Sequence, residues 1–319
     1  MHAVFLDQQT FSANISLDNI RQQVTSLNCF ATTSPEQLLS RCAQADIVIT
    51  NKVELTQNTL EQLPKLKLVC VAATGTNNVD LAAAAQLGIQ VKNVAGYSTT
   101  SVSQYVFAQM LEYFNQTNLY NQDSAQGAWQ KSPTFCYHSG EISELYGKKL
   151  GIVGYGNLGK AVAKIAEAFG MKILIAERPY AATIRQNRLS FEQVLSEADI
   201  LTLHCPQTPE TENLINAQTL SQMKPSAMLI NTARGALVNS NDLHAALKNK
   251  RLGYGVLDVL EQEPPSADHI LIRAISAQEP DLHLNNLKIT AHIAWASIES
   301  QQRLLDLLAD NISHFKSKC

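Results

Sequence analysis

The sequence predicts an α/β protein with two parallel-sheet domains, and three observations carry this prediction. Short apolar runs typical of buried strands alternate with helical stretches along the whole chain. At 319 residues the chain is longer than one ordinary hydrophobic core needs. A glycine-rich segment of the kind that binds phosphates occurs near the middle of the chain, whereas none follows the first apolar run. We therefore expect one nucleotide-binding domain and one α/β domain of another kind.

The first hundred residues favour the domain that does not bind a nucleotide. A helix is expected after Ser34-Pro35, because serine suits an N-cap and proline suits the first helical turn. The expected strands are Ala3–Leu6, Ile47–Thr50, Leu68–Ala72 and Val91–Asn93. Strands and helices that alternate in this way indicate a parallel sheet covered by helices.

A long apolar helix from Thr99 to about Asn118 is expected next, followed by a polar stretch at 121–143. That stretch contains Trp129, Phe135 and Tyr137. Aromatic side chains on an extended arm suggest an interface with a second copy of the chain, and we expect a homodimer. The alternative is that the arm folds back on its own domain.

The glycine-rich segment is the most informative part of the chain. The apolar run Leu150–Val153 predicts a buried strand, and Gly154, Gly156 and Gly159 follow it as G-x-G-x-x-G. The first glycine permits a tight turn, the second lets the backbone approach a pyrophosphate, and the third lets helix and strand pack closely. The helix that begins here, at Asn157 and Leu158, presents free N–H groups to the phosphates. The segment predicts a dinucleotide site.

The second strand of this unit indicates which dinucleotide binds. Gly170 ends the helix, Lys172–Ala176 forms the strand, and Glu177 stands at its end, 18 residues after Gly159. A carboxylate there can accept both ribose hydroxyls of NAD and repels the 2′-phosphate of NADP. NAD is therefore the expected cofactor, although Arg178 could pair with a 2′-phosphate if it pointed inward.

The rest of the chain suggests an inserted domain. The final amphipathic helix, Ser297–Phe315, is most economically placed back on the first domain. The predicted division is 1–98 with 288–319 as a flavodoxin-like substrate domain, and 99–287 as a Rossmann-like NAD domain that includes the interdomain helix and the arm. The later strands are expected at Ile200–His204, Ala227–Asn231, Gly255–Asp258 and Leu287–Thr290.

Bulk composition excludes several classes of partner. The net charge of −3 without a basic run argues against nucleic acid, and no apolar run is long enough to cross a bilayer. The N-terminus has no leader pattern, so we expect a cytoplasmic protein. The six cysteines lack metal-binding spacing, which predicts free thiols and no metal site. They are Cys29, Cys42, Cys70, Cys136, Cys205 and Cys319.

Three chemically useful side chains follow the later strands. Arg234 comes just after one strand, Glu263 after the next, and His292 after the last. The two intervals are 29 residues each. Because open α/β sheets bind ligands at the carboxyl ends of their strands, we expect a cation, a carboxylate and an imidazole to share one crevice.

These motifs resemble the D-isomer-specific 2-hydroxyacid dehydrogenases over essentially the whole chain. The resemblance rests on the glycine loop, on Asn231-Thr-Ala-Arg-Gly, on Asp258-Val-Leu-x-x-Glu-Pro-Pro and on the late His292. Within the family, 72–80 and 291–297 are most similar to the glycerate dehydrogenase (hydroxypyruvate reductase) branch. The resemblance implies reduction of hydroxypyruvate to D-glycerate, with glyoxylate as a second substrate.

The expected roles follow from the chemistry of a 2-keto acid. His292 would exchange a proton with the substrate oxygen, and a hydrogen bond from its ring to the Glu263 carboxylate would fix its tautomer and raise its pKa. Arg234 would hold the substrate carboxylate, and the Thr74-Gly75-Thr76 turn would bind its far side. The resemblance extends the cofactor site, beyond the glycine loop and Glu177, to Ser103, His204, Cys205, Pro206, Thr232, Ala233 and Asp258.

Two features of the chain depart from the family pattern, and three alternative functions can be compared with it. Ala291 replaces the proline that the family usually has before the histidine, and the polar segment 266–286 is expected to form a surface excursion near the site. Another branch, such as a D-lactate-type dehydrogenase, would keep the chemistry and change the substrate. A protein of another class, which binds NAD to control a partner without turnover, would not need the three polar residues. A purely structural scaffold would explain neither them nor the glycines.

Overall fold

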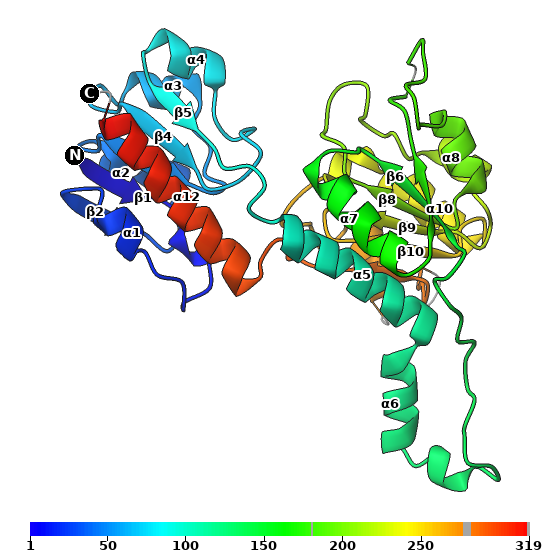
Figure 1. Ribbon diagram of the computed structural model, residues 1–319. Coiled ribbons are helices and arrows are strands. Elements are labelled where there is room, and N and C mark those ends of the chain that lie inside the picture. The colour runs from blue at the N-terminus through cyan, green and yellow to red at the C-terminus, as the bar shows by residue number, and fades with distance from the viewer. Residues whose placement is uncertain (180, 277–281, 318–319) are drawn as a thin grey trace. The chain divides into compact units, whose positions relative to one another are not determined.

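The computed structural model describes residues 1–179, 181–276 and 282–317. The chain forms two compact units, the first from Met1–Ser101 together with the segment from Trp295, and the second from Val102–Ala294. Both contain a fully parallel sheet with helices (Figure 1). The predicted fold class, two parallel-sheet α/β domains, is confirmed.

The first unit has a five-stranded sheet in the order β2-β1-β3-β4-β5, which is the flavodoxin-like order. Its central strands are entirely buried because every residue of β3 and β4 is apolar or, as Thr50, hydrogen-bonded. The C-terminal helix α12 packs on α1 and β4, so the two ends of the chain share one core (Figure 1). The elements are β1 (His2–Phe5), η1 (Gln8–Thr10), α1 (Asp18–Arg21), β2 (Ser26–Cys29), α2 (Pro35–Cys42), β3 (Ile47–Thr50), α3 (Gln57–Glu61), β4 (Leu68–Val71), α4 (Leu81–Gln86), β5 (Gln90–Lys92) and α12 (Ile298–Lys316).

The second unit has a six-stranded sheet in the order β11-β10-β9-β8-β6-β7. From β6 the chain passes first to β7 on one side of it and then to β8 on the other, so the direction in which strands are added to the sheet reverses at β6. Open sheets bind ligands at such a point. Helix α5 begins in the first unit and continues into the second. The elements are α5 (Thr99–Asn115), α6 (Thr117–Ala125), η2 (Trp129–Lys131), β6 (Lys149–Val153), α7 (Asn157–Ala168), β7 (Lys172–Ile175), α8 (Phe191–Glu197), β8 (Ile200–Leu203), α9 (Ala217–Gln222), β9 (Met228–Asn231), η3 (Gly235–Leu237), α10 (Ser240–Lys248), β10 (Tyr254–Leu257), α11 (Ile270–Ile275) and β11 (Leu287–Ile289).

The structure moves the second domain boundary. The sequence suggested a return to the first domain at residue 288, but β11 pairs with β10 through Leu287, Lys288 and Ile289. The strand therefore belongs to the six-stranded sheet, and the boundary lies between Ala294 and Trp295. His292 is consequently part of the same unit as Arg234 and Glu263.

Two further segments differ from expectation. The arm at 121–143 is not wholly extended, because its first part continues the helix α6, which leads away from the sheet in Figure 1. Segment 266–286 is not simply a surface excursion, since α11 packs on α10 and buries Leu271 and Ala274 in the core. Residues 277–281 of that segment lie outside the described residues.

Within the described residues no helix has the length and apolarity needed to span a membrane, and no cluster of side chains has metal-ligand geometry. The thiols of Cys29, Cys42, Cys70, Cys136 and Cys205 are unbridged, and Cys319 lies outside the described residues.

Candidate active site

The glycine loop after β6 has the geometry that a phosphate-binding turn requires. Gly154 has φ +96°, and a Cβ there would lie 2.5 Å from the main chain of His204 and Cys205. A Cβ on Gly159 would lie 2.2 Å from the carbonyl oxygen of Gly154, so this glycine lets α7 pack on the loop. At Gly156, by contrast, a Cβ would meet no heavy atom of the described chain within 4 Å. The loop is therefore closely packed at Gly154 and Gly159 and open at Gly156, which leaves room for a pyrophosphate at the start of α7.

Two buried polar atoms just after the neighbouring strands β8 and β9 are unsatisfied. The Nδ1 of His204 follows β8 and the Oγ1 of Thr232 follows β9; both are buried and find no hydrogen-bond partner among the described residues. Buried polar atoms are normally paired, so these two fit a site that a polar ligand completes. Burial lowers the pKa of His204 to about 4, so its imidazole is neutral at working pH. The residues present thus suit a dinucleotide.

Glu177 stands at the end of β7 as predicted, and its carboxylate is already engaged. It is 3% exposed and accepts hydrogen bonds from the main-chain N–H groups of Arg178 (2.8 Å) and Arg185 (3.1 Å). The Arg185 guanidinium also donates to both carboxylate oxygens, with Nε at 2.8 Å. This side-chain bond holds the pKa of Glu177 well below its usual range. A ribose at this position would have to share the carboxylate with Arg185, a partner that the sequence did not indicate.

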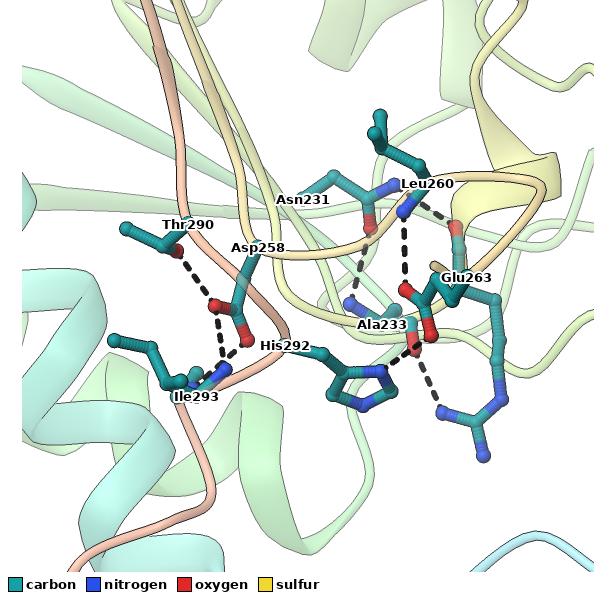
Figure 2. A network of polar contacts seen from close by, with 10 residues as sticks. Asn231, Ala233, Asp258, Leu260, Glu263, Thr290, His292 and Ile293 are labelled. Carbon is teal, nitrogen blue, oxygen red and sulfur yellow. Dashed lines mark hydrogen bonds and ion pairs between the residues drawn. The ribbon is translucent and has the colours of Figure 1, made fainter. Parts of the chain in front are cut away.

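The turn after β9 carries Arg234. The Asn231 side chain bridges the turn, accepting from Ala233 N–H (3.0 Å) and donating to the Arg234 carbonyl (2.8 Å) (Figure 2). The Arg234 guanidinium donates to the Ala233 carbonyl at 2.7 Å, which leaves most of its donors for other acceptors. A Cβ on Gly235 would lie 1.8 Å from the Leu260 carbonyl carbon, so this turn is in backbone contact with the loop after β10.

That neighbouring loop carries Glu263, which contacts His292. One carboxylate oxygen accepts from Leu260 N–H at 3.1 Å, and the other lies 2.6 Å from His292 Nδ1 (Figure 2). Because an ionised carboxylate only accepts, Nδ1 carries the proton, and Nε2 is left to face a ligand. Each side chain is about 30% exposed, so the pair is accessible. The predicted hydrogen bond between Glu263 and His292 is present.

Asp258 holds the loop in which His292 lies. One carboxylate oxygen accepts from Thr290 Oγ1 (2.6 Å) and Ile293 N–H (2.9 Å), and the other from Ala294 N–H (2.8 Å) (Figure 2). The Asp258 carbonyl also accepts from His292 N–H at 2.8 Å. Burial raises the pKa of Asp258, and its hydrogen bonds and the nearby His292 oppose that rise. The sequence predicted cofactor orientation for Asp258 and did not reveal this clamp, although its strand-end position was a usable signal.

The other predicted residues are dispersed. Ser103 is buried on α5, and Cys205 and Pro206 follow β8 beside the glycine loop. Burial raises the pKa of the Cys205 thiol to about 11, so it is a poor nucleophile. The Thr74-Gly75-Thr76 turn follows β4 of the first unit, where Thr74 Oγ1 donates to the Val94 carbonyl at 3.2 Å. The remaining residues that were predicted to bind the cofactor lie at the start of α7 and in the turn after β9; they are Asn157, Leu158, Thr232 and Ala233.

Comparisons with known proteins show which family this chain belongs to. A sequence profile described as D-isomer specific 2-hydroxyacid dehydrogenase, NAD binding domain, matches residues 107–294. The chain is 41% identical to a glycerate dehydrogenase of Methylorubrum extorquens, over 98% of this chain and 95% of that protein. It is 37% identical to a hydroxypyruvate reductase of Blautia hydrogenotrophica, over 89% and 86% of the two chains.

Solved structures show the same similarity. The D-lactate dehydrogenase of Aquifex aeolicus, complexed with NAD and lactic acid, superposes with a TM-score of 0.82 at 25% identity and covers 100% of this chain and 96% of its own. The family profile covers the glycine loop, Arg234, Glu263 and His292 together. The chain therefore belongs to the D-isomer-specific 2-hydroxyacid dehydrogenase family and is an NAD-dependent oxidoreductase.

Proposed function

We propose that this enzyme reduces hydroxypyruvate to D-glycerate, with glyoxylate as a second substrate. The observation that carries the proposed chemistry is the 2.6 Å contact between His292 Nδ1 and Glu263, which leaves Nε2 as the proton donor. The substrate assignment is supported by the names of the relatives at 41% and 37% identity, a glycerate dehydrogenase and a hydroxypyruvate reductase. A D-lactate-type substrate is the alternative within the family.

In the proposed mechanism, NADH supplies the hydride when it is bound. His292 holds a proton on Nε2 and gives it to the substrate oxygen as negative charge develops there. Glu263 accepts from Nδ1–H, which orients the ring and fixes its tautomer. In the oxidative direction the same Nε2 takes the proton back.

Arg234 is proposed to bind the substrate carboxylate. Its guanidinium is planar and always charged, and a 2-keto acid offers a carboxylate and an adjacent carbonyl that a forked donor can bind together. The Asn231 bridge fixes the turn from which Arg234 projects. We also propose that Thr74, Gly75 and Thr76 contribute to substrate binding, as the family resemblance implies.

The test follows NADH absorbance at neutral pH with hydroxypyruvate, glyoxylate, pyruvate and 2-ketoisocaproate. Fastest turnover with hydroxypyruvate supports the proposal, whereas preference for pyruvate or 2-ketoisocaproate moves the enzyme to another branch. NADH binding without turnover of any keto acid would instead support the NAD-controlled binding protein. Measuring NADH binding separately, by the fluorescence of the bound cofactor, distinguishes these outcomes.

Two variants test the residue roles. His292→Ala should bind NADH normally and lose about 10²–10⁴-fold in kcat, the usual contribution of a general acid. Arg234→Ala should raise KM for the keto acid and lower kcat while NADH still binds. Wild-type turnover in either variant would remove that residue from the mechanism.

We further propose that the arm joins two copies of the chain. Phe135 is 91% exposed and Trp129 is 55% exposed, and a monomer would leave these large apolar side chains in water. Sedimentation of the wild type should give a dimer, and Phe135→Asp should shift it toward monomer without affecting the fold. A wild-type monomer at all concentrations would refute the proposal.

A further inference from the structure

We propose that Tyr105 is a positioning residue for His292, acting through Thr290 and Asp258. This inference rests on the proposed role of His292 as proton donor. Tyr105 lies on α5, far from the glycine loop and the strand ends in sequence, and no motif points to it. Its hydroxyl nevertheless lies 2.6 Å from Thr290 Oγ1, in the segment just before His292.

The direction of each hydrogen bond follows from the acceptors. The Asp258 carboxylate receives two main-chain N–H groups, one on each oxygen, and Thr290 Oγ1 lies 2.6 Å from one of these oxygens. The single hydroxyl proton of Thr290 therefore goes to Asp258. Thr290 Oγ1 can then only accept from the phenol, so Tyr105 donates. The result is a chain of two hydrogen bonds, in which Tyr105 donates to Thr290 and Thr290 donates to Asp258.

This chain ends on the group that shapes the catalytic loop. His292 has φ +54°, a left-handed backbone conformation that residues other than glycine rarely adopt unless their surroundings impose it. Asp258 supplies that constraint, because it binds the N–H groups of His292, Ile293 and Ala294. Tyr105 orients the Thr290 hydroxyl toward Asp258 and so strengthens the constraint from outside the loop.

The charged groups around the loop give the expected sign of the effect. Glu263 faces the imidazole from the loop after β10, Asp258 faces it from the end of β10, and Arg234 stands on the neighbouring turn after β9. Burial raises the pKa of Tyr105 to about 12, so the phenol remains a donor throughout an enzymatic pH profile. Weakening the hydrogen bonds between Tyr105, Thr290 and Asp258 lets the negative charge of Asp258 move relative to the imidazole. The imidazolium form is then less favoured.

The test compares Tyr105→Phe and Thr290→Val, which each remove one hydroxyl, with Thr290→Ser, which keeps it. Tyr113→Phe, on the same helix, is the matched control. Thr290→Val removes a hydrogen bond to the charged Asp258 and should lower kcat about tenfold, whereas Tyr105→Phe removes a bond between neutral groups and should lower kcat about fivefold. The alkaline limb of the kcat profile for reduction should move about half a pH unit lower, since reduction needs the protonated imidazole. KM and NADH affinity should change less than about twofold, and Thr290→Ser and Tyr113→Phe should behave as wild type.

The outcomes separate this inference from the function on which it rests. If His292→Ala loses turnover while Tyr105→Phe keeps the wild-type kcat and pH profile, the positioning role is refuted and the proposed function stands. If His292→Ala remains fully active, the proposed function itself fails. A fall in kcat that Tyr113→Phe shares, with an unmoved pH profile, would show general loosening of α5 and would also overturn the inference.

Discussion

Acid should destabilise the second unit through His204, whose pKa in the folded protein is about 4 against an ordinary 6.5. Between these two values the unfolded chain takes up a proton that the folded protein excludes. The contribution that neutral His204 makes to the free energy of unfolding is therefore fully present above pH 6.5 and is lost as the pH falls toward 4. The size of the depression corresponds to a loss of about 3 kcal/mol over that interval.

The cause is local and can be removed. His204 Nδ1 is buried without a partner among the described residues, and Nε2 lies 3.0 Å from the Thr202 hydroxyl. A second proton would have to be carried on a ring that has little to donate to. His204→Gln keeps a polar group near Thr202 and cannot titrate, so it should lose this part of the pH dependence.

The assay is urea unfolding at about pH 7, 6, 5 and 4 for the wild type and for His204→Gln, with the exposed His283→Gln as control. The free energy of unfolding of the wild type should fall more steeply with acid than that of His204→Gln, by up to about 3 kcal/mol in total. His283→Gln should follow the wild type. Parallel curves for the wild type and His204→Gln would refute the reasoning.

Three other predictions address the site. Gly235→Ala should cost about 1–3 kcal/mol and most of the activity, because its Cβ would overlap the Leu260 carbonyl; a wild-type melting temperature and kcat would contradict this. Glu263→Gln removes the negative charge beside His292, so the alkaline limb of the reductive pH profile should move to lower pH, and an unmoved profile would argue against the pairing. Arg185→Ala should free the Glu177 carboxylate, lowering KM for NADH several-fold and raising KM for NADPH. Unchanged KM values for both cofactors would show that Arg185 does not compete with the ribose.

The strands show what the sequence could and could not predict. Ile47–Thr50 is found as predicted, and the predicted strand Leu68–Ala72 is one residue longer than β4. Both could be predicted because strands buried on both faces consist of continuous apolar runs. The strand β2, Ser26–Cys29, was missed. It lies at the edge of its sheet and is half-exposed, so its composition carries little apolar signal.

The candidate site divides in the same way. The sequence placed Arg234, Glu263 and His292 at strand ends, because an apolar run followed by a polar residue is visible without coordinates. It could not show the left-handed conformation of His292 or the engagement of both Asp258 oxygens. Those features depend on contacts between loops, and residue types alone do not specify which main-chain groups a carboxylate will meet.

The sheet order explains why the three residues act as one group. Strands β9, β10 and β11 are consecutive neighbours, so the loop that carries Glu263 lies between the turn of Arg234 and the loop of His292. Its backbone touches Gly235 on one side, and the Glu263 carboxylate contacts His292 on the other. Asp258, at the end of the same central strand, fixes the His292 loop through its main chain. A displacement of the loop after β10 would therefore move both the Arg234 guanidinium and the His292 imidazole. For this reason a substitution at Gly235 should impair catalysis, although Gly235 has no side chain that could take part in the reaction.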